Sequence, residues 1–105
     1  MKLMVTGRTG QSFFVKGVKF DGVGTGVLLE VKGLGYANFI RNGHFRDWFS
    51  GADELAKQAR DQLRAACGTP IQWHVAEADA ATVIRNLFAD RGIIGIHIIH
   101  TPGLP

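Results

Sequence analysis

Two charged side chains stand at the end of an apolar stretch, residues 27–33, which reads Val-Leu-Leu-Glu-Val-Lys-Gly. The stretch predicts a buried strand, in which alternate side chains point to opposite faces of a sheet. Glu30 and Lys32 therefore share one face, and the side chain of Val31 points to the other. Ionised groups on so apolar a strand need a partner, which can be each other, a metal ion or a substrate.

A third charged side chain, Asp21, stands nine residues before Glu30. The glycine-rich segment 22–26 between them can fold into a hairpin that brings the two carboxylates together. Hard cations such as Mg²⁺ prefer oxygen ligands, commonly one or two carboxylates plus water and substrate oxygens. We therefore expect Asp21 and Glu30 to be metal ligands, with the backbone carbonyl of Val31 as a further one. Lys32 can then orient or deprotonate a water molecule and offset the charge of a phosphodiester under attack.

The same residues have a simpler interpretation. Asp-Gly is a common turn pair, and Glu30 and Lys32, two residues apart on a strand, can form a surface ion pair. From the residue pattern alone, a metal-dependent phosphodiesterase site and a structural ion pair both stay open.

The composition is that of one globular domain covering residues 1–105. Hydrophobic residues make up 46% of the chain and charged residues 20%, which favours a single packed core over disorder. The net charge of +3 permits a polyanionic partner without requiring one. No signal peptide or membrane-length apolar run is visible, so we expect no membrane partner. The single cysteine, Cys67, excludes an internal disulfide, and we expect it to be buried at a helix end.

Hydrophobic patterning and turn residues predict the order β-β-β-loop-α-β-α-β. The expected strands cover residues 2–6, 12–20 (with a bulge or bend at Gly17), 25–32, 71–76 and 93–99. We expect Asp53 to cap a helix over 54–67, and Asp79 to cap a second helix that ends near Arg91. This order predicts an α/β domain, with a mixed sheet flanked by helices.

The first predicted helix carries two amides, Gln58 and Gln62, four residues apart beside its apolar face. Because they do not join the charged face, they point toward whatever the helix packs on. By contrast, we interpret Trp73 as a core residue, and His74, His97 and His100 as structural.

The long connection over residues 34–52 mixes aromatic and basic side chains. Connections of this length in compact domains are usually functional or disordered, and the aromatic content argues against disorder. Basic residues interleaved with aromatic ones suit single-stranded or distorted nucleic acid, although a small second core or a protein-binding surface fits equally well. The candidate substrate-binding residues are Tyr36, Arg41, His44, Arg46 and Gln62.

Several segments in order resemble the restriction endonuclease fold toxin 5 domain, over roughly residues 15–103. They are Val18-Lys19-Phe20-Asp21-Gly22, residues 28–36, Gln58-Ala59-x-x-Gln62, residues 71–77, and the closing Gly-Ile-Ile-Gly-Ile with His100-Thr101-Pro102. The resemblance implies a restriction-endonuclease-like fold and a nuclease of the PD-(D/E)xK superfamily, here with the pattern D-x8-E-V-K. Such nucleases commonly begin with a helix carrying another acidic residue, whereas this chain starts almost directly with strand-like sequence.

The resemblance also implies roles and partners. Asp21 and Glu30 would bind Mg²⁺, with Mn²⁺ as a possible substitute, Lys32 would be the catalytic lysine, and Gln58 would support the site. Such domains are C-terminal toxins of larger bacterial effectors, often delivered by type VI secretion. The implied partners are nucleic acid, with DNA preferred, a cognate immunity protein, and a secretion apparatus or its chaperone bound through regions outside this chain.

The leading hypothesis is therefore a Mg²⁺-dependent DNA endonuclease toxin that acts in the cytoplasm of a recipient bacterium. An RNA-cleaving toxin of the same fold is one alternative. A catalytically silent binding module, in which the charged cluster is only an ion pair, is another.

Overall fold

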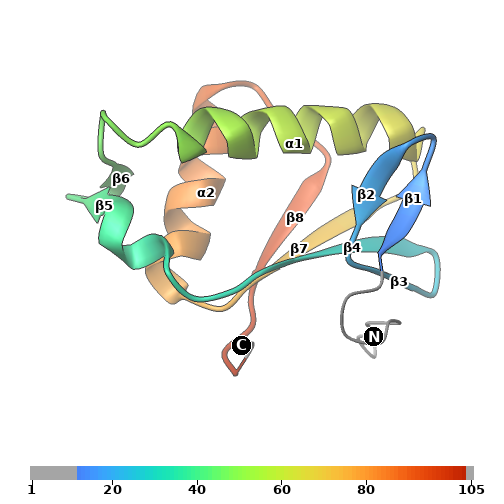
Figure 1. Ribbon diagram of the computed structural model, residues 1–105, viewed down its shortest axis with the longest axis horizontal. Helices are drawn as coiled ribbons and strands as arrows, with labels where there is room; N and C mark the ends of the chain where they lie inside the picture. The colour runs from blue at the N-terminus through green and yellow to red at the C-terminus, as the bar shows by residue number, and fades with distance from the viewer. Residues whose placement is uncertain (1–11, 104–105) are drawn as a thin grey trace.

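A four-stranded mixed sheet forms the centre of the computed structural model, which describes residues 12–103 (Figure 1). The strand predicted at residues 2–6 lies outside the described residues. The strand order is β3-β4-β7-β8, in which β3 runs antiparallel to β4, and β4, β7 and β8 are parallel. Their bounds are Gly22–Gly24 for β3, Val27–Lys32 for β4, Ile71–Val75 for β7 and Ile96–His100 for β8.

Two helices, α1 (Gly51–Ala66) and α2 (Ala78–Asp90), pack on one face of this sheet. Their small and aliphatic side chains form one core with alternate residues of β4, β7 and β8. Trp73 and Ile71 are among the largest fully buried side chains of that core. The prediction of an α/β domain with a mixed sheet and packed helices is confirmed.

The helix starts differ from the predicted caps. Ser50 occupies the N-cap position of α1, so Asp53 lies inside the first turn, where a carboxylate still favours the helix dipole. Glu77, and not Asp79, precedes α2. The prediction that Cys67 is buried is wrong, because this residue turns the chain out of α1 in a left-handed conformation (φ 48°) and its side chain is exposed.

Residues 12–20 form a hairpin and not one bent strand. Strands β1 (Phe13–Val15) and β2 (Val18–Phe20) pair antiparallel. Lys16 and Gly17 between them both have positive φ, at 50° and 81°, as a tight two-residue hairpin turn requires. The final strand starts at Ile96 and not at residue 93, because Gly95 (φ 109°) breaks the extended backbone.

The connection over residues 34–52 is compact. It contains a 3₁₀ helix, η1 (Tyr36–Phe39), and a short hairpin of β5 (Ile40–Arg41) and β6 (His44–Phe45). Phe39 stacks on Phe49 with ring centroids 4.3 Å apart, and Phe45 lies 5.1 Å from Phe49. These three rings pack together, and Phe45 also packs against the main core. No helix among residues 12–103 has the length and apolar character needed to cross a membrane.

Candidate active site

The β3–β4 hairpin brings Asp21 to the edge of β4. The last β3–β4 pair is Gly22 with Leu29, and the Asp21 N–H donates to the Leu29 carbonyl over 2.9 Å. Beyond Leu29 strand β4 continues without β3, and the Asp21 Oδ2 accepts the Val31 N–H over 2.8 Å. The carboxylate thus takes the place of the next strand residue, which fixes it beside Glu30.

Glu30 is buried, with 5% of its surface exposed, and its carboxylate accepts three side-chain hydrogen bonds. Lys32 Nζ and Gln58 Nε2 both donate to Oε2, each over 2.9 Å. Gln62 Nε2 donates to Oε1 over 3.1 Å. The two glutamines come from α1, so the packing of this helix on the sheet sets the orientation of the carboxylate.

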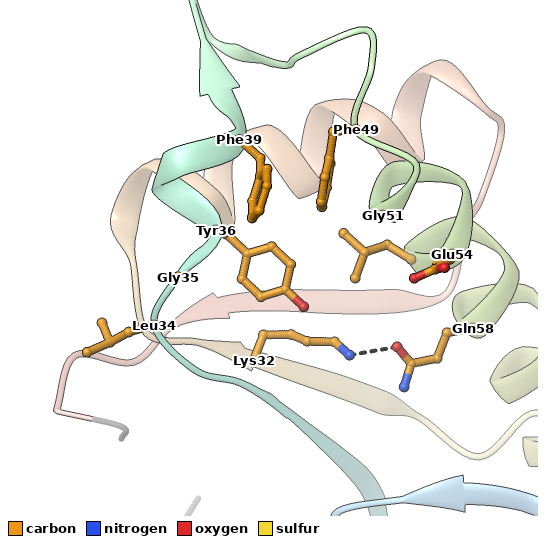
Figure 2. A pocket seen from close by; sticks show the side chains of 10 residues that line it. Lys32, Leu34, Gly35, Tyr36, Phe39, Phe49, Gly51, Glu54 and Gln58 are labelled. Carbon is orange, nitrogen blue, oxygen red and sulfur yellow. Dashed lines mark hydrogen bonds between the residues drawn. The ribbon is translucent and has the colours of Figure 1, made fainter.

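Lys32 is held on three sides. Its Nζ donates to Gln58 Oε1 over 2.6 Å (dashed in Figure 2) and to Glu30, and it lies 4.9 Å from the centre of the Trp73 ring. A cation over an indole face is attracted by the ring's negative electrostatic potential. The amine is therefore positioned before any substrate arrives.

The indole of Trp73 also supports the site through Gln62. Trp73 Nε1 donates to Gln62 Oε1 over 2.8 Å, and the Gln62 amide in turn reaches Glu30. The parallel register pairs Glu30 with Trp73 across β4 and β7, which explains how a core residue joins the network. Gln62, a candidate substrate-binding residue, is fully buried, and there its amide orients Glu30.

Burial raises the pKa of Glu30 above its ordinary value of 4.5, while the charge of Lys32 beside it opposes that rise. The negative charge of Asp21 acts in the same direction as burial. A buried carboxylate with a second carboxylate nearby favours the binding of a cation, because a cation relieves both effects.

The donor set fits a hard divalent cation. Asp21 and Glu30 supply carboxylate oxygens, and within residues 12–103 the contact of Asp21 Oδ1 is a long ion pair, 4.0 Å from Lys19 Nζ. The N–H and C=O of one strand residue point to the same edge, so the Val31 carbonyl lies on the edge where Asp21 binds the Val31 N–H. Among residues 12–103 no cluster of three or more acidic, histidine or cysteine side chains could hold a metal. Mg²⁺ often binds through one or two carboxylates and keeps several waters, so two suffice.

A pocket of about 450 Å³ opens beside Lys32 and Gln58. Figure 2 shows Tyr36, Phe39 and Phe49 on one side of it and Glu54 on α1 on the other. Burial, followed by the negative charges of Glu30 and Glu54, raises the pKa of Tyr36 above its ordinary value of 10.0. Tyr36 is thus the candidate substrate-binding residue that lies next to the charged cluster.

Glu77 anchors the segment that carries Tyr36. Its Oε1 accepts the backbone N–H groups of Gly35, Tyr36 and Ala37, over 3.2, 2.7 and 3.2 Å. These N–H groups open the 3₁₀ helix η1, where backbone donors have no partner within the helix. A carboxylate at the start of α2 therefore fixes one wall of the pocket.

The other candidate substrate-binding residues lie apart from the charged cluster. Arg41, His44 and Arg46 line two separate hollows around the β5–β6 hairpin, at the end of the molecule opposite the β1–β2 hairpin (Figure 1). The structure does not bring them together with Glu30 and Lys32.

The histidines do not join the site either. His74 is buried, with Nδ1 2.8 Å from Thr101 Oγ1 and Nε2 3.0 Å from Gln72 Oε1, which agrees with a structural role. His100 Nε2 lies 3.2 Å from the Ala76 carbonyl, and His97 is exposed on β8.

Sequence reasoning missed three residues around the site: Trp73 as a support, Glu54 at the pocket and Glu77 beneath Tyr36. For Glu54 a signal existed, because Glu54, Gln58 and Gln62 recur every four residues and so share one helix face. Glu77 and Trp73 gave no such signal, since their partners lie far away in the sequence.

A family model of the restriction endonuclease fold toxin 5 matches residues 4–78, more than half of the chain. The match includes the charged cluster and its two glutamines, and it ends before most of α2 and all of β8. The resemblance to this family is confirmed, although it was expected to reach residue 103. Searches among curated proteins and among solved structures each found no match. The matched family and the mixed α/β sheet together show that the chain belongs to the restriction endonuclease fold toxin 5 family, which indicates a nuclease toxin.

Proposed function

We propose that the chain is a Mg²⁺-dependent endonuclease toxin that hydrolyses phosphodiester bonds of DNA. The observation that carries this proposal is the convergence of Asp21 and Glu30 with the amine of Lys32, beside an open pocket. A structural ion pair would need neither the second carboxylate nor the pocket. The family, a nuclease toxin family, supports the same class of reaction.

Asp21 and Glu30, with the Val31 carbonyl, would hold the cation. The chemistry that Mg²⁺ supplies when bound is neutralisation of the phosphate charge and a lower pKa of the attacking water. Mn²⁺, which prefers similar oxygen ligands, would substitute for it.

Hydrolysis forms a bond from a water oxygen to phosphorus and breaks the bond from phosphorus to the leaving sugar oxygen. Overall, one proton leaves the water and one proton reaches the leaving oxygen. Lys32 lies within 2.9 Å of Glu30, where its amine would orient the water and offset the charge that develops on the phosphate. Gln58 forms hydrogen bonds with both Lys32 and Glu30 and would hold the two side chains in fixed relative positions.

The family is the only support for the proposed biological setting. The chain would be the toxin domain, residues 1–105, at the C-terminal end of a larger secreted effector, delivered by type VI secretion or a related apparatus. It would act in the cytoplasm of a recipient bacterium. In the producing strain, a cognate immunity protein would neutralise it.

Cleavage of plasmid DNA by purified protein tests the activity. Wild type is expected to degrade plasmid with Mg²⁺ and to stop in EDTA, whereas Glu30→Ala and Lys32→Ala are expected to be inactive. Lys57→Ala is the matched control, because Lys57 lies on the outer face of α1 and pairs only with Asp61 among the described residues. Cleavage at the wild-type rate by both Glu30→Ala and Lys32→Ala would contradict the site assignment.

Expression inside bacteria tests the toxin role and the substrate together. Wild type is expected to kill with loss of the nucleoid, and Lys32→Ala is expected to be tolerated. Death of wild-type cells with intact DNA and degraded RNA would replace DNA by RNA as the substrate.

A further inference from the structure

The pocket beside Lys32 has the size and position of a subsite for part of the substrate. Its volume, about 450 Å³, exceeds that of a single nucleobase and leaves room for the attached sugar. Lys32 and Gln58 form one of its walls, so whatever fills it lies directly next to the proposed reaction centre.

The apolar walls of the pocket are built from aromatic rings in fixed positions. Phe39 and Phe49 are stacked at an angle of 16°, and Tyr36 lies below them with its hydroxyl directed toward Lys32 and helix α1 (Figure 2). Gly51 leaves space for this stack, because a Cβ there would come within 2.0 Å of the Phe49 ring. Half-buried rings beside a phosphate-handling group suit the stacking of a base.

Two polar groups lie at the same pocket. The Glu54 side chain stands on the α1 side, and the Tyr36 hydroxyl stands on the other side. A tyrosine hydroxyl is protonated at neutral pH, so that of Tyr36 can donate a hydrogen bond. The pocket therefore offers a carboxylate acceptor and a hydroxyl donor around an aromatic surface.

We propose that this pocket holds one unpaired guanine of the nucleic acid, stacked on Tyr36 and bonded to Glu54. Guanine presents two adjacent donors on one edge, N1–H and the N2 amino group, and a single carboxylate can accept both. Cytosine and adenine place a ring acceptor beside their amino group, which would face the carboxylate with a lone pair. The inference rests on the proposed nuclease function and adds a substrate class to it: a strand with an unpaired guanine next to the scissile bond.

Binding of mononucleotides tests the pocket without any cleavage, since a mononucleotide has no phosphodiester bond to cut. In NMR titrations with 5′-GMP, 5′-AMP, 5′-CMP and 5′-UMP, GMP is expected to shift the signals of Tyr36 and Leu55. Its affinity is expected to be about fivefold or more above the other three, the scale of one bidentate base contact. Equal affinity for all four nucleotides would overturn the guanine assignment, and no shift at Tyr36 would overturn the pocket assignment.

Variants separate the stacking surface from the carboxylate. Tyr36→Ala is expected to weaken binding of GMP roughly tenfold by loss of stacking, while Tyr36→Phe keeps the ring and most of the affinity. Glu54→Gln is expected to abolish the advantage of GMP over UMP. Asp53→Asn is the control with the same change of charge, because Asp53 lines a different hollow and pairs with Arg91 over 2.8 Å.

Cleavage mapping connects the pocket to the reaction. On a single-stranded oligonucleotide with one guanine, wild type and Asp53→Asn are expected to cut next to that guanine, and Glu54→Gln is expected to lose the preference. Cutting without base preference, together with no binding of GMP, would contradict the guanine pocket and agree with the proposed nuclease function. Binding of GMP by a protein that cuts no nucleic acid would contradict the proposed nuclease function and agree with the guanine pocket.

Discussion

The amide of Gln62 bridges Glu30 and Trp73. Its Nε2 lies 3.1 Å from Glu30 Oε1, and its Oε1 lies 2.8 Å from Trp73 Nε1. One buried side chain thus joins helix α1 to strands β4 and β7. The fold and the proposed catalytic geometry depend on the same contact.

Gln62→Leu is expected to destabilise the fold and reduce cleavage. The change leaves the Trp73 N–H and one Glu30 oxygen without a protein partner, and each buried group left unpaired costs about 1–3 kcal/mol. Urea denaturation measures the loss. Arg60→Leu, on the exposed face of the same helix, is the control and is expected to change stability by less than about 0.5 kcal/mol. Equal stability of the two variants would show that the bridge contributes nothing.

Lys32→Met is expected to make stability fall more steeply as pH rises. The pKa of Glu30 is raised above 4.5, so its contribution to stability is full below pH 4.5 and is lost as pH rises through the folded-state pKa. Removal of the Lys32 charge raises that pKa further. The variant is expected to lose about 3–5 kcal/mol at neutral pH, and less near pH 4.5, in urea denaturation with EDTA. A loss that does not depend on pH would contradict this coupling.

Addition of Mg²⁺ or Mn²⁺ is expected to raise the melting temperature of the wild type. At a concentration about ten times Kd the gain is about 1.4 kcal/mol, or roughly 6–11 °C for a domain of this size. The combined change Asp21→Asn and Glu30→Gln is expected to remove the shift. Asp61→Asn, which alters a carboxylate on the outer face of α1, is expected to keep it. Differential scanning fluorimetry gives the readout, and an unchanged shift in the double variant would place the cation elsewhere.

His74→Gln is expected to remove a loss of stability on acidification. Burial, followed by the charge of His97, lowers the pKa of His74 below 6.5. Its contribution to stability is therefore present above pH 6.5 and is lost as pH falls through the folded-state pKa. The difference in unfolding free energy between wild type and His74→Gln, measured from pH 5 to pH 8, is expected to shrink at low pH. The exposed His44, changed to Gln as control, is expected to leave the wild-type profile intact.

Glu77→Ala is expected to loosen the wall of the pocket. Three backbone N–H groups at residues 35–37 lose their acceptor, at a cost of about 1–3 kcal/mol. Hydrogen exchange at these amides is expected to accelerate, while Asp79→Ala, an exposed carboxylate in the first turn of α2, leaves it unchanged. Unaltered exchange in Glu77→Ala would mean that η1 holds its shape without this contact.

Local patterns were enough to predict which charged side chains gather at the end of β4. Alternation along a strand placed Glu30 and Lys32 on one face, and the glycine-rich hairpin placed Asp21 beside them. The inward direction of Gln58 and Gln62 followed from the helical period. These inferences need only neighbours in the sequence, or one turn between two strands.

Contacts between distant segments could not be predicted in the same way. The pairing of Glu30 with Trp73 depends on the parallel register of β4 and β7, which no short-range pattern specifies. The hydrogen bond that the Tyr36 N–H donates to Glu77 joins residues 41 positions apart in the sequence. The caps failed for a different reason, because Asp53 and Ser50 are both good N-cap residues and tertiary packing decides between them.

The glutamines of α1 and Glu54 lie on one face of a rigid helix. A rise of about 1.5 Å per residue separates Glu54 from Gln62 by about 12 Å along the axis, and each added residue turns the helix by about 100°. A one-residue insertion between Glu54 and Gln58 would therefore rotate Glu54 away from the pocket while leaving Gln58 and Gln62 in place. A change in the first turn of α1 would therefore alter the pocket without disturbing Glu30. The next two turns must keep their rotation about the helix axis, because Gln58 and Gln62 bind the Glu30 carboxylate.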